Sequence, residues 1–475
     1  MQQRISSTPT ALAPAAGTTA DVVVAGSGIG GLSAAATAAR AGARVTVLEK
    51  LPVPGGSAAL SAGMFWTASD LASLRRRIPL GDAALGAAVV EDYDAALAEI
   101  RRLGIRADDE PTLDVMTFGR GYSLDIAALL AVCADVVRAA GGQVLTSHAL
   151  RALATDEHGA VRGAYVHRPD GTQTLVHAHS VILATGGFQG APDLLGRHVG
   201  PNADRLVLRS NPGSVGDGLR AAQAVGAGGT RAMHSFYGHL LPHPLDSFKP
   251  ADYLPLTQYH SAHSVLVGLD GHRLCDESLG DEIANQELAA RPGARGVLVF
   301  DDAVRRERAC SAPFPGVAAL DRLERARAAG ARTASAATLP ELVDTVASWG
   351  VDGETLTTTL AAYAAAAESK APRAAGVAMP AVPTTLATAP FHATEVQPSI
   401  TFTFGGIPVS RHGEVLDRDG NVLPGLYAAG VDVGGLSNGG YAGGLAPSYI
   451  TGRWAGAHAA AYAVARGVRT KGERA

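Results

Sequence analysis

The sequence lacks the features that mark several large classes of protein. Its 475 residues include only three cysteines, Cys133, Cys275 and Cys310, which are widely separated and form no C-x-x-C pair. This spacing indicates neither a zinc ribbon nor an iron–sulfur site, and it predicts reduced thiols of the kind found in the cytosol. The net charge is −4 and no extended basic stretch occurs, which argues against a nucleic-acid partner.

Long apolar segments are missing as well. No uninterrupted apolar stretch has the length that a membrane span needs, so we expect no span and a soluble, cytoplasmic protein. Residues 1–20 are rich in Ser, Thr, Ala and Pro, which predicts a flexible tail and not a signal peptide. The remaining length is enough for a large core and two domains.

Glycine, by contrast, is abundant, with 57 residues, and the most informative glycines follow the first predicted strand. Val22-Val23-Val24 predicts a buried parallel strand. Gly26, Gly28 and Gly31 then fit the pattern G-x-G-x-x-G, and a helix of small residues runs on to Gly42. In this pattern the first glycine allows a tight turn, the second lets a pyrophosphate approach the backbone, and the third permits close packing of helix and strand.

The next segment supports a dinucleotide. A second predicted strand, residues 43–48, ends at Glu49, about 20 residues beyond the glycines, where an acid can bind ribose hydroxyls. The start of the helix, at Ile29 and Gly30, would face the phosphates with its positive end. Strand, glycine turn, helix, second strand and terminal acid together predict that the chain binds an adenine dinucleotide.

A second loop of small residues favours FAD over NAD. It begins at Gly55-Gly56-Ser57 and continues to Ala62-Gly63. The protein backbone must follow a flavin from its pyrophosphate to its ring system, whereas a nicotinamide-binding domain needs no second loop of this kind.

Later segments are expected to complete the cofactor domain. Helices are predicted over 70–110 and 124–140, and strands over 143–153, 161–166 and 172–177 predict a small antiparallel sheet.

Two further segments return the chain to the cofactor. Val181 to Gly187 predicts a buried strand that ends in a glycine-rich turn, and Leu426 to Gly430 predicts a short strand that leads into glycines 434–444. Leu445-Ala446-Pro447 then begins a helix that extends to about residue 465. The positive end of this helix would face the flavin edge that carries negative charge in the reduced ring.

The composition changes between residues 235 and 385. Six of the 15 histidines lie between His234 and His272, among the aromatic residues Phe236, Tyr237, Tyr253 and Tyr259. A metal site is one interpretation, but His260 and His263 lack a carboxylate at a known ligand spacing. We therefore favour a polar, aromatic wall for a substrate and expect no metal.

These patterns predict an α/β protein with a Rossmann-like FAD-binding domain in two sequence pieces and an inserted α+β cap domain. The expected boundaries are a tail over 1–20, the first FAD-binding part over 21–235, the cap over 236–385 and the second FAD-binding part over 386–475.

The motifs together resemble the fumarate reductase/3-ketosteroid dehydrogenase superfamily of flavoproteins. The matching stretches are GSGIGG, GGSAALSAG, ILATGGF, GHRLCDES and PGLYAAG, followed by a run of glycines, and they occur in family order along nearly the whole chain. The resemblance implies a hydride transfer between a substrate carbon and flavin N5, while a side chain moves the matching proton. It also implies that the substrate lies between the cap and the FAD-binding domain.

The same resemblance, with the glycine patterns, indicates which residues contact the cofactor. We expect non-covalent FAD, because residues 55–63, where covalent relatives attach their flavin, contain no histidine. Asp432 is included because Val431 stands where many relatives have a glutamate on the ribityl chain. The expected contacts are Gly26, Gly28, Ile29, Gly30, Gly31, Glu49, Lys50, Gly55, Gly56, Ser57, Ala62, Gly63, Ala149, Thr185, Gly186, Gly187, Gly430, Asp432, Gly444, Leu445 and Ala446.

The anchors that fumarate reductases use for a dicarboxylate are missing. Asp281 occupies the position of their first arginine, Thr401 and Phe402 stand where they have a histidine pair, and Tyr441 replaces their last arginine. Two carboxylates without cationic partners in a dry pocket would be very unfavourable. The sequence therefore resembles the ketosteroid dehydrogenase branch more closely.

In that branch a tyrosine in the final glycine run holds the carbonyl oxygen of the substrate, and Tyr441 matches it. Tyr441 would donate a hydrogen bond to the enolate that forms there, and the alternative role for it is packing against the flavin alone. The base tyrosine of that branch corresponds to Asp281, which could instead cap the next helix. Tyr237, His239, Tyr259 and His263 are rival acid–base groups.

We therefore expect an FAD-dependent dehydrogenase that introduces a C=C bond next to a carbonyl in a mostly apolar, steroid-like or polyketide-like substrate. The electron acceptor or donor is unknown. Three alternatives remain open: an enoate or ketone reductase that runs the reverse reaction, an O2-using oxidase or monooxygenase, and a non-catalytic FAD-binding scaffold.

Overall fold

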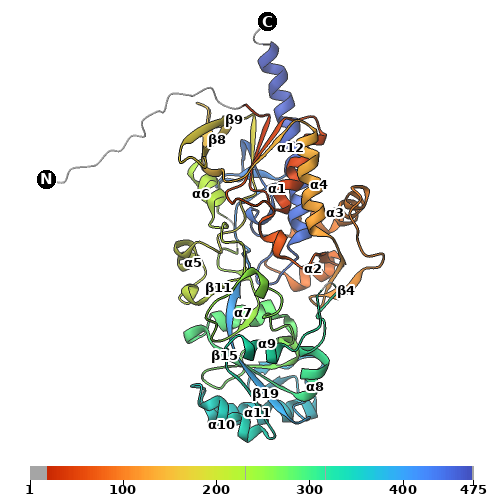
Figure 1. Ribbon diagram of the computed structural model, residues 1–475, viewed down its shortest axis with the longest axis vertical. Coiled ribbons are helices and arrows are strands. Elements are labelled where there is room, and N and C mark those ends of the chain that lie inside the picture. The colour runs from red at the N-terminus through yellow and green to blue at the C-terminus, as the bar shows by residue number, and fades with distance from the viewer. Residues whose placement is uncertain (1–18, 230–231, 316, 473–475) are drawn as a thin grey trace, which may run out of the picture.

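The computed structural model describes residues 19–229, 232–315 and 317–472. Most of the predicted tail, residues 1–20, lies outside this range. The molecule is elongated, with helix α12 (Leu445–Gly472) extending to one extremity and helices α10 (Leu339–Ala347) and α11 (Gly353–Ser369) at the other (Figure 1). None of the helices in the described ranges is long and apolar enough to cross a membrane.

A mostly parallel sheet forms the core of the upper half. Val, Ile and Leu fill its central strands, which are buried on both faces, as is usual for parallel sheets covered by helices. The chain reverses its strand order between β1 and β10, the position at which such sheets bind ligands. In spatial order the strands are β6 (Gln143–Leu145), β2 (Val45–Leu48), β1 (Val22–Ala25), β10 (Ser180–Leu183), β22 (Val422–Ala428) and the antiparallel edge strand β21 (Glu414–Leu416).

Two helices of small residues pack directly on each other beside this sheet. Helix α1 (Ile29–Arg40) lies against α12 (Leu445–Gly472). A Cβ atom at Gly456 would lie 2.3 Å from the carbonyl oxygen of Ala34, so the two backbones are nearly in contact. The abundance of alanine and glycine in both helices therefore follows from how closely they approach.

Smaller elements surround the sheet. The predicted strand over 143–153 is in fact two strands, because β6 joins the parallel sheet and only β7 pairs with β8. The turn between them lets one segment serve two sheets. The surrounding elements are α2 (Leu71–Arg77), α3 (Ala83–Arg102), α4 (Ile126–Ala139), α5 (Pro192–His198), α6 (Asp217–Ala224), the sheet of β3 (Met64–Ala68), β5 (Gly119–Ser123) and β4 (Thr112–Val115), and the sheet of β7 (Ala149–Thr155), β8 (Val161–His167) and β9 (Gln173–His177).

A second sheet organises the lower half around one long strand, β19 (Phe391–Ile400). This strand pairs with β11, β13, β15 and β16. Helix α7 (Asp281–Ala289) lies above this sheet, and α9 to α11 lie around and below it (Figure 1). The other elements are β11 (Val207–Leu208), β13 (Leu240–Pro242), β14 (Val265–Gly268), β15 (Gly296–Asp301), β16 (Thr333–Ala336), β17 (Arg373–Ala374), β18 (Val377–Ala378), α8 (Asp302–Val304) and α9 (Arg322–Ala328).

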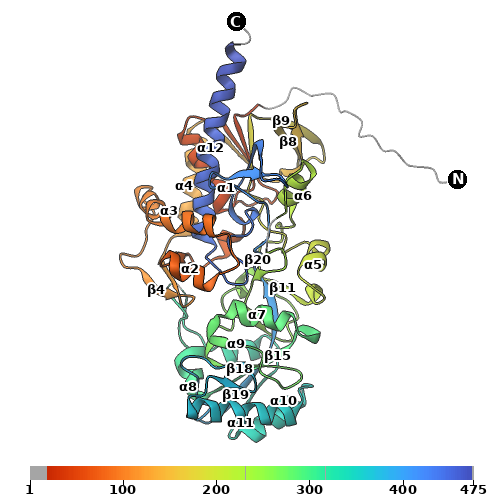
Figure 2. The ribbon, with the colours of Figure 1, turned by 180° about the vertical axis from the view of Figure 1, so that it is seen from behind.

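The two halves meet at a short strand pair, β12 (Phe236–Tyr237) and β20 (Phe402–Thr403), which lies near mid-height (Figure 2). Since β19 pairs with strands of the lower half, the chain returns to the upper half only after residue 400. The Rossmann-like α/β architecture is as predicted. The division at 235 and 385 into two FAD-binding parts and a cap stays a prediction.

Candidate active site

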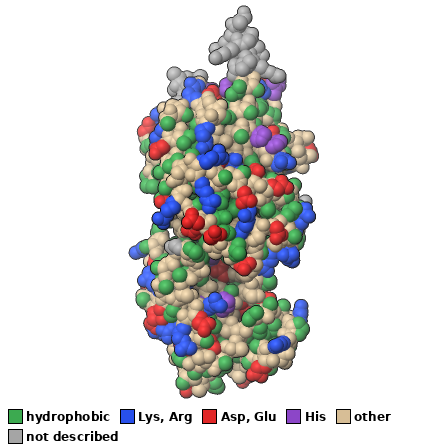
Figure 3. Space-filling model, turned by 90° about the vertical axis from the view of Figure 1, so that its right-hand side faces the viewer, with side chains coloured by type: hydrophobic (Ala, Val, Ile, Leu, Met, Phe, Trp, Pro, Cys, Tyr) green, Lys and Arg blue, Asp and Glu red, His purple; other side chains and the backbone are tan. Residues whose placement is uncertain are grey.

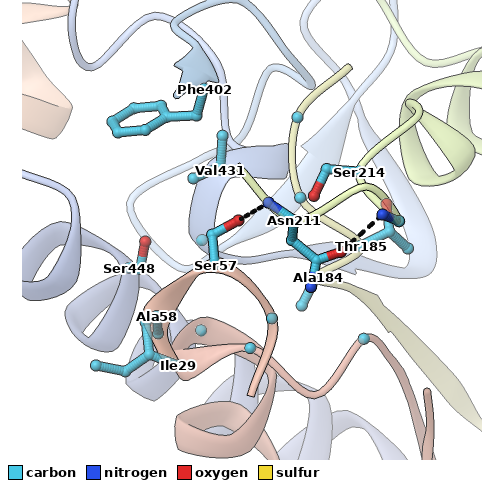
Figure 4. A pocket seen from close by; sticks show the side chains of 18 of the residues that line it. Ile29, Ser57, Ala58, Ala184, Thr185, Asn211, Ser214, Phe402, Val431 and Ser448 are labelled. Atoms are coloured by element: carbon cyan, nitrogen blue, oxygen red, sulfur yellow. Dashed lines mark hydrogen bonds between the residues drawn. The ribbon is translucent and has the colours of Figure 1, made fainter. Parts of the chain in front are cut away.

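A cleft runs from the glycine turn after β1 to the strand pair between the halves. Its upper end is lined by the carboxyl ends of β1, β2 and β10, and its lower end by Tyr237, Tyr253, Thr401 and Phe402. The molecular surface is hollowed near mid-height on one face (Figure 3). In the close-up view, Ile29 and Ala58 lie together on one side of the cleft, and Phe402 and Val431 lie on another (Figure 4).

The glycine turn forms a bare backbone surface. Gly26 has a φ of +108°, which favours glycine, and a Cβ atom at Gly31 would lie 2.0 Å from the carbonyl oxygen of Gly26. A Cβ atom at Gly28, in contrast, would meet no described atom within 4 Å. Gly28 is the N-cap of α1, and no side chain of the described residues caps this helix. The open space at Gly28 and the helix end suit a phosphate group.

Glu49 lies at the end of β2 and lines the cleft. Its carboxylate accepts hydrogen bonds from the backbone N–H and the hydroxyl of Ser27, at 3.0 and 2.5 Å. It also accepts one from the N–H of Leu51, at 2.8 Å. The acid is therefore fixed in place beside the glycine turn, in the position expected for a ribose contact.

The second glycine loop folds into a 3₁₀ turn over Gly56–Leu60. Gly55 precedes it with a φ of +119°. The hydroxyl of Ser57 accepts a hydrogen bond from the N–H of Asn211 at 3.3 Å and lies 2.9 Å from the hydroxyl of Ser210 (Figure 4). The loop thus spans the cleft to a segment about 150 positions later, instead of lying on the surface.

Asp432 is buried and holds the turn after β10. Its carboxylate accepts hydrogen bonds from the backbone N–H and the hydroxyl of Thr185. Burial raises the pKa of this carboxyl to about 7. Asp432 itself does not line the cleft, whereas its neighbour Val431 does.

The cleft brings together most of the residues that the sequence predicts for the cofactor. Of that set, Gly26, Gly28, Ile29, Gly30, Glu49, Lys50, Gly56, Ser57, Thr185, Gly186, Gly187, Gly430, Gly444 and Leu445 line it. Gly31, Gly55, Ala62, Gly63, Ala149, Asp432 and Ala446 lie outside the lining. For Ala149, the two neighbours His148 and Leu150 line the cleft instead.

Several lining residues carry no motif that predicts them. Gln189, Asn211 and Ser214 come from the loops after β10 and β11, and Asp217 is the first residue of α6. The turn residues Asn211-Pro212-Gly213 are the one signal in the sequence that indicates a loop at this position.

Aromatic side chains form the lower end of the cleft. The rings of Tyr237 and Tyr441 stack with centroids 3.8 Å apart and planes 19° from parallel. Phe402 and Trp66 contact Tyr441 edge-on, with centroids 5.7 and 5.1 Å away. Burial raises the pKa of Tyr441 far above its ordinary value, so its hydroxyl stays a hydrogen-bond donor. A side chain at Gly444 would come within 3.1 Å of this hydroxyl, so the glycine keeps space around it.

Three of the predicted acid–base residues form a hydrogen-bonded chain that ends at the cleft. The hydroxyl of Tyr237 lies 2.6 Å from Nε2 of His239, and Nδ1 of His239 contacts a carboxylate oxygen of Asp281. Only Tyr237 lines the cleft. Asp281 is the first residue of α7, and its carboxylate bonds His239 instead of capping that helix.

A buried guanidinium lies behind the lower wall. Arg209 is 1% exposed and donates hydrogen bonds to the hydroxyls of Thr257 and Thr401 and to the carbonyl of Tyr253. Its guanidinium carbon also lies 3.6 Å from the centroid of the Tyr253 ring. The described residues offer it no carboxylate within ion-pair distance. No motif in the sequence predicts Arg209 as a functional residue. The one signal for it is a charged residue directly after the apolar segment Val207-Leu208.

The other predicted acid–base residues lie apart from the cleft. Tyr259 contacts the edge of the His239 ring, with centroids 5.5 Å apart, and does not reach the lining. His263 does not line the cleft either, and its carbonyl accepts a hydrogen bond from Thr384. Within the described ranges, no group of three or more His, Cys, Asp or Glu could hold a metal ion.

Comparison with known proteins agrees with this geometry. A family model described as an FAD binding domain matches residues 21–445. Fumarate reductase (cytochrome) of Shewanella frigidimarina is 29% identical over 481 residues, which cover 95% of this chain and 79% of that protein. Vinyl phenol reductase of Lactiplantibacillus plantarum is 26% identical over 480 residues, which cover 93% of this chain and 96% of that protein.

Solved structures show the same fold. A 3-ketosteroid-Δ4-(5α)-dehydrogenase from Rhodococcus jostii, in complex with 4-androstene-3,17-dione, superposes with a TM-score of 0.73 at 22% identity. The match covers 93% of this chain and 97% of that one. Together, the FAD binding domain model and the fumarate reductase relative confirm the predicted resemblance to the fumarate reductase/3-ketosteroid dehydrogenase superfamily, and they confirm FAD as the cofactor. Its non-covalent attachment stays a prediction, which release of flavin into the supernatant on denaturation would check.

The glycine turn gives a matched pair of variants for FAD binding. Gly28→Ala should leave the apoprotein as stable as the wild type, because the φ of −68° suits any residue and the new methyl group meets no atom. The methyl should occupy space that the pyrophosphate needs and weaken FAD binding about tenfold or more, or about 1.4 kcal/mol. Flavin fluorescence titration of the apoprotein measures this.

Gly31→Ala is the contrasting change, since its methyl group would overlap the carbonyl of Gly26. It should destabilise the apoprotein itself by about 1–3 kcal/mol or more. Equal FAD affinity in Gly28→Ala and the wild type would show that the cofactor does not approach Gly28.

A second prediction concerns the buried acid next to Asp281. Burial raises the pKa of Glu282 from 4.5 to about 8, and its Oε2 has no hydrogen-bond partner among the described residues. The folded protein therefore keeps a proton that the unfolded chain releases, so this contribution to stability is lost as the pH rises through about 8. Each unit of difference between the folded and unfolded pKa corresponds to about 1.4 kcal/mol.

Glu282→Gln should therefore make the free energy of unfolding fall less steeply between about pH 5 and pH 8. The free energy of unfolding should still decrease somewhat with rising pH in this variant, because burial also raises the pKa of Asp432. Urea titrations across this range measure it, with Glu287→Gln on the exposed face of α7 as the control. Identical slopes in Glu282→Gln and the wild type would contradict the prediction.

Proposed function

This chain belongs to the FAD binding domain family, and we propose that, as an FAD-dependent oxidoreductase acting on CH–CH groups, it desaturates the bond next to a carbonyl in an apolar substrate. The observation that carries the proposal is the lower end of the cleft, where Tyr237, Tyr253, Phe402 and Tyr441 supply aromatic walls. No arginine lines the cleft within the described residues. Such walls favour a flat, apolar molecule over a small dianion.

Two hydroxyl groups support a carbonyl at this end of the cleft. Thr401 lines the cleft and accepts a hydrogen bond from Arg209 at 3.1 Å, and no acceptor for its own proton is found in the described part of the chain. Its hydroxyl can therefore donate to an oxygen in the cleft, as can that of Tyr441.

These donors suit the charge that the reaction creates. Loss of the proton beside a carbonyl places negative charge on the carbonyl oxygen, and preorganised donors stabilise that charge. The positive charge of Arg209, held behind Thr401, acts in the same direction. Bound FAD supplies the acceptor for the hydride, and the turn at Gly26–Gly31, Glu49 and the loop at Gly56–Leu60 would hold it.

The reverse reaction is the second candidate. Two relatives of this chain are named as reductases, fumarate reductase and vinyl phenol reductase, and the second is matched over 96% of its length. The same donors would polarise an unsaturated carbonyl for reduction. Dehydrogenase and reductase share one site, so the direction depends on the partner that supplies or takes the electrons. The sequence leaves that partner unknown, and a cytoplasmic location stays a prediction from the sequence.

The direct test is a pair of half-reactions under anaerobic conditions. Cyclic and aromatic ketones with a CH–CH bond beside the carbonyl should bleach the oxidised flavin. Enones of the same skeletons should reoxidise the flavin after dithionite reduction if the reverse direction operates. The faster half-reaction identifies the direction, and the absence of both would refute the proposal. Rapid reaction of the reduced enzyme with O2 would favour an oxidase instead.

Fumarate and succinate serve as negative controls in this screen. Asp281, Phe402 and Tyr441 occupy the positions of cationic anchors, so we expect neither compound to react at an ordinary turnover rate. Fumarate-dependent oxidation of the reduced flavin at more than about 1 s⁻¹, the low end of usual enzyme turnover, would contradict this.

Tyr441→Phe tests the carbonyl donor. The substitution keeps the ring and its stacking on Tyr237 and removes one donor, so FAD content should not change. Loss of one such donor slows the chemical step by about 10²–10³-fold, and rapid-mixing absorbance measures it. Tyr363→Phe, a buried tyrosine of the lower half that lies outside the cleft, is the control. A decrease below about threefold, under 1 kcal/mol, would assign Tyr441 to packing alone.

A further inference from the structure

We propose that Tyr237 is the catalytic residue that carries the substrate proton, and that His239 and Asp281 are positioning residues that relay it. This inference rests on the proposed function and names the proton carrier of that same site. Its basis is the hydrogen-bonded chain from the cleft into the protein interior.

The three groups form a hydrogen-bonded chain, and only the first of them can be reached from the cleft. Tyr237 lies on β12 and faces the cleft, opposite Phe402 on β20. His239 is 4% exposed and Asp281 is 9% exposed, and neither lines the cleft. A substrate can therefore exchange a proton with Tyr237 directly, and with the other two only through Tyr237.

Backbone hydrogen bonds and two neighbouring rings hold His239 between Tyr237 and Asp281. The N–H of His239 donates to the hydroxyl of Ser399 at 3.1 Å, and that hydroxyl donates back to the carbonyl of His239 at 2.6 Å. Its ring also packs against the edges of Tyr237 and Tyr259. Rotation of the ring would break both hydrogen bonds of the chain, so the order tyrosine, histidine, aspartate is held.

The protonation states follow from the partners. Burial lowers the pKa of His239, despite the nearby carboxylate, so the ring is neutral at rest. The carboxylate of Asp281 can only accept, so Nδ1 carries the ring proton and Nε2 accepts from the hydroxyl of Tyr237. Burial also raises the pKa of Tyr237, so this hydroxyl does not ionise unless a base takes its proton.

The relay supplies that base. In desaturation the C–H bond beside the carbonyl breaks, its proton joins the oxygen of Tyr237, and the hydride leaves the neighbouring carbon for FAD. The original hydroxyl proton of Tyr237 passes to Nε2 of His239. The imidazolium that results lies against the carboxylate of Asp281, which stabilises it. In reduction every proton moves the opposite way.

The charged groups near His239 come from two elements, β11 and α7. Arg209, at the end of β11, disfavours the imidazolium, whereas Asp281, in the first turn of α7, favours it. Glu282, next on α7, interacts with Asp281 and is itself shifted toward its neutral form by burial. Oδ1 of Asp281 has no hydrogen-bond partner within the described residues, so no other donor there offsets the negative charge that faces His239.

The lower half contains a similar chain that serves as a control. Nδ1 of His392 lies 2.9 Å from the hydroxyl of Ser335, and its Nε2 lies 3.4 Å from Asp302. None of the three lines the cleft. His392→Gln therefore removes a buried histidine from a hydroxyl–histidine–carboxylate chain without affecting the proposed relay.

The kinetic test uses the FAD-loaded enzyme and the compound that the screen finds. Tyr237→Phe should slow the faster half-reaction by about 10²-fold or more, as expected for loss of a general acid–base group, with FAD content unchanged. His239→Gln should slow it as well, and the double variant should be no slower than Tyr237→Phe, because the two groups act as one unit. His392→Gln should match the wild type. A decrease below about threefold in Tyr237→Phe, or additive losses, would overturn the relay.

A spectroscopic test is independent of turnover. In nitrogen NMR of histidine-labelled protein, the signals of His239 are identified by their disappearance in His239→Gln. At neutral pH they should be those of a neutral ring with its proton on Nδ1. Tyr237→Phe should shift its Nε2 signal, and Asp281→Asn should change its tautomer. A charged His239, or a proton on Nε2, would overturn the relay even if no carbonyl compound reacts. If the NMR agrees but no carbonyl compound reacts, only the proposed function fails.

Discussion

The structure depends on three stretches of backbone that approach without side chains between them. A Cβ atom at Gly26 would lie 2.0 Å from the carbonyl oxygen of Ala184, and one at Gly30 would lie 2.8 Å from Cα of Gly430. These residues belong to the turns after β1, β10 and β22, which are far apart in the sequence. Their contact closes the upper end of the cleft and brings helix α12 against α1. A substitution there would therefore alter the sheet, the helix pair and the cofactor site together.

The lower end of the cleft depends on a different constraint, which is the electrostatic cost of a buried charge. Arg209 is a buried cation, and an isolated charge in a dry interior is very unfavourable. Its hydrogen bonds to two threonine hydroxyls, and its cation–π contact with the ring of Tyr253, offset part of that cost. Asp281 supplies a negative charge in the same region. A reaction that builds negative charge on a substrate oxygen beside Thr401 is favoured by this arrangement, whereas a dianionic substrate would meet no arginine among the described residues that line the cleft.

The sequence was a good guide to the cofactor half and a poorer one to the substrate half, for a physical reason. Gly26, Gly28 and Gly31 have roles that depend on local backbone geometry, so their spacing alone predicts the turn. Arg209 and Tyr237 lie in one region because β11 pairs with residues 399–400 and β12 pairs with residues 402–403, which no local pattern records. The pattern over residues 143–153 predicts a single strand, because propensity cannot show that β6 pairs with β2 and β7 pairs with β8.

The acid–base residues show the same limit, which is that local sequence patterns do not record contacts between distant segments. The sequence predicts Tyr237, His239 and Asp281 only as separate candidates and gives no indication that they form one hydrogen-bonded chain. A lone aspartate at the start of a helix is usually a cap, but the carboxylate of Asp281 turns to His239 instead. Because the imidazole separates the carboxylate from the cleft, Asp281 adds no negative charge to the cleft lining. An anionic enolate can then form beside Tyr441 without a like charge in contact with it.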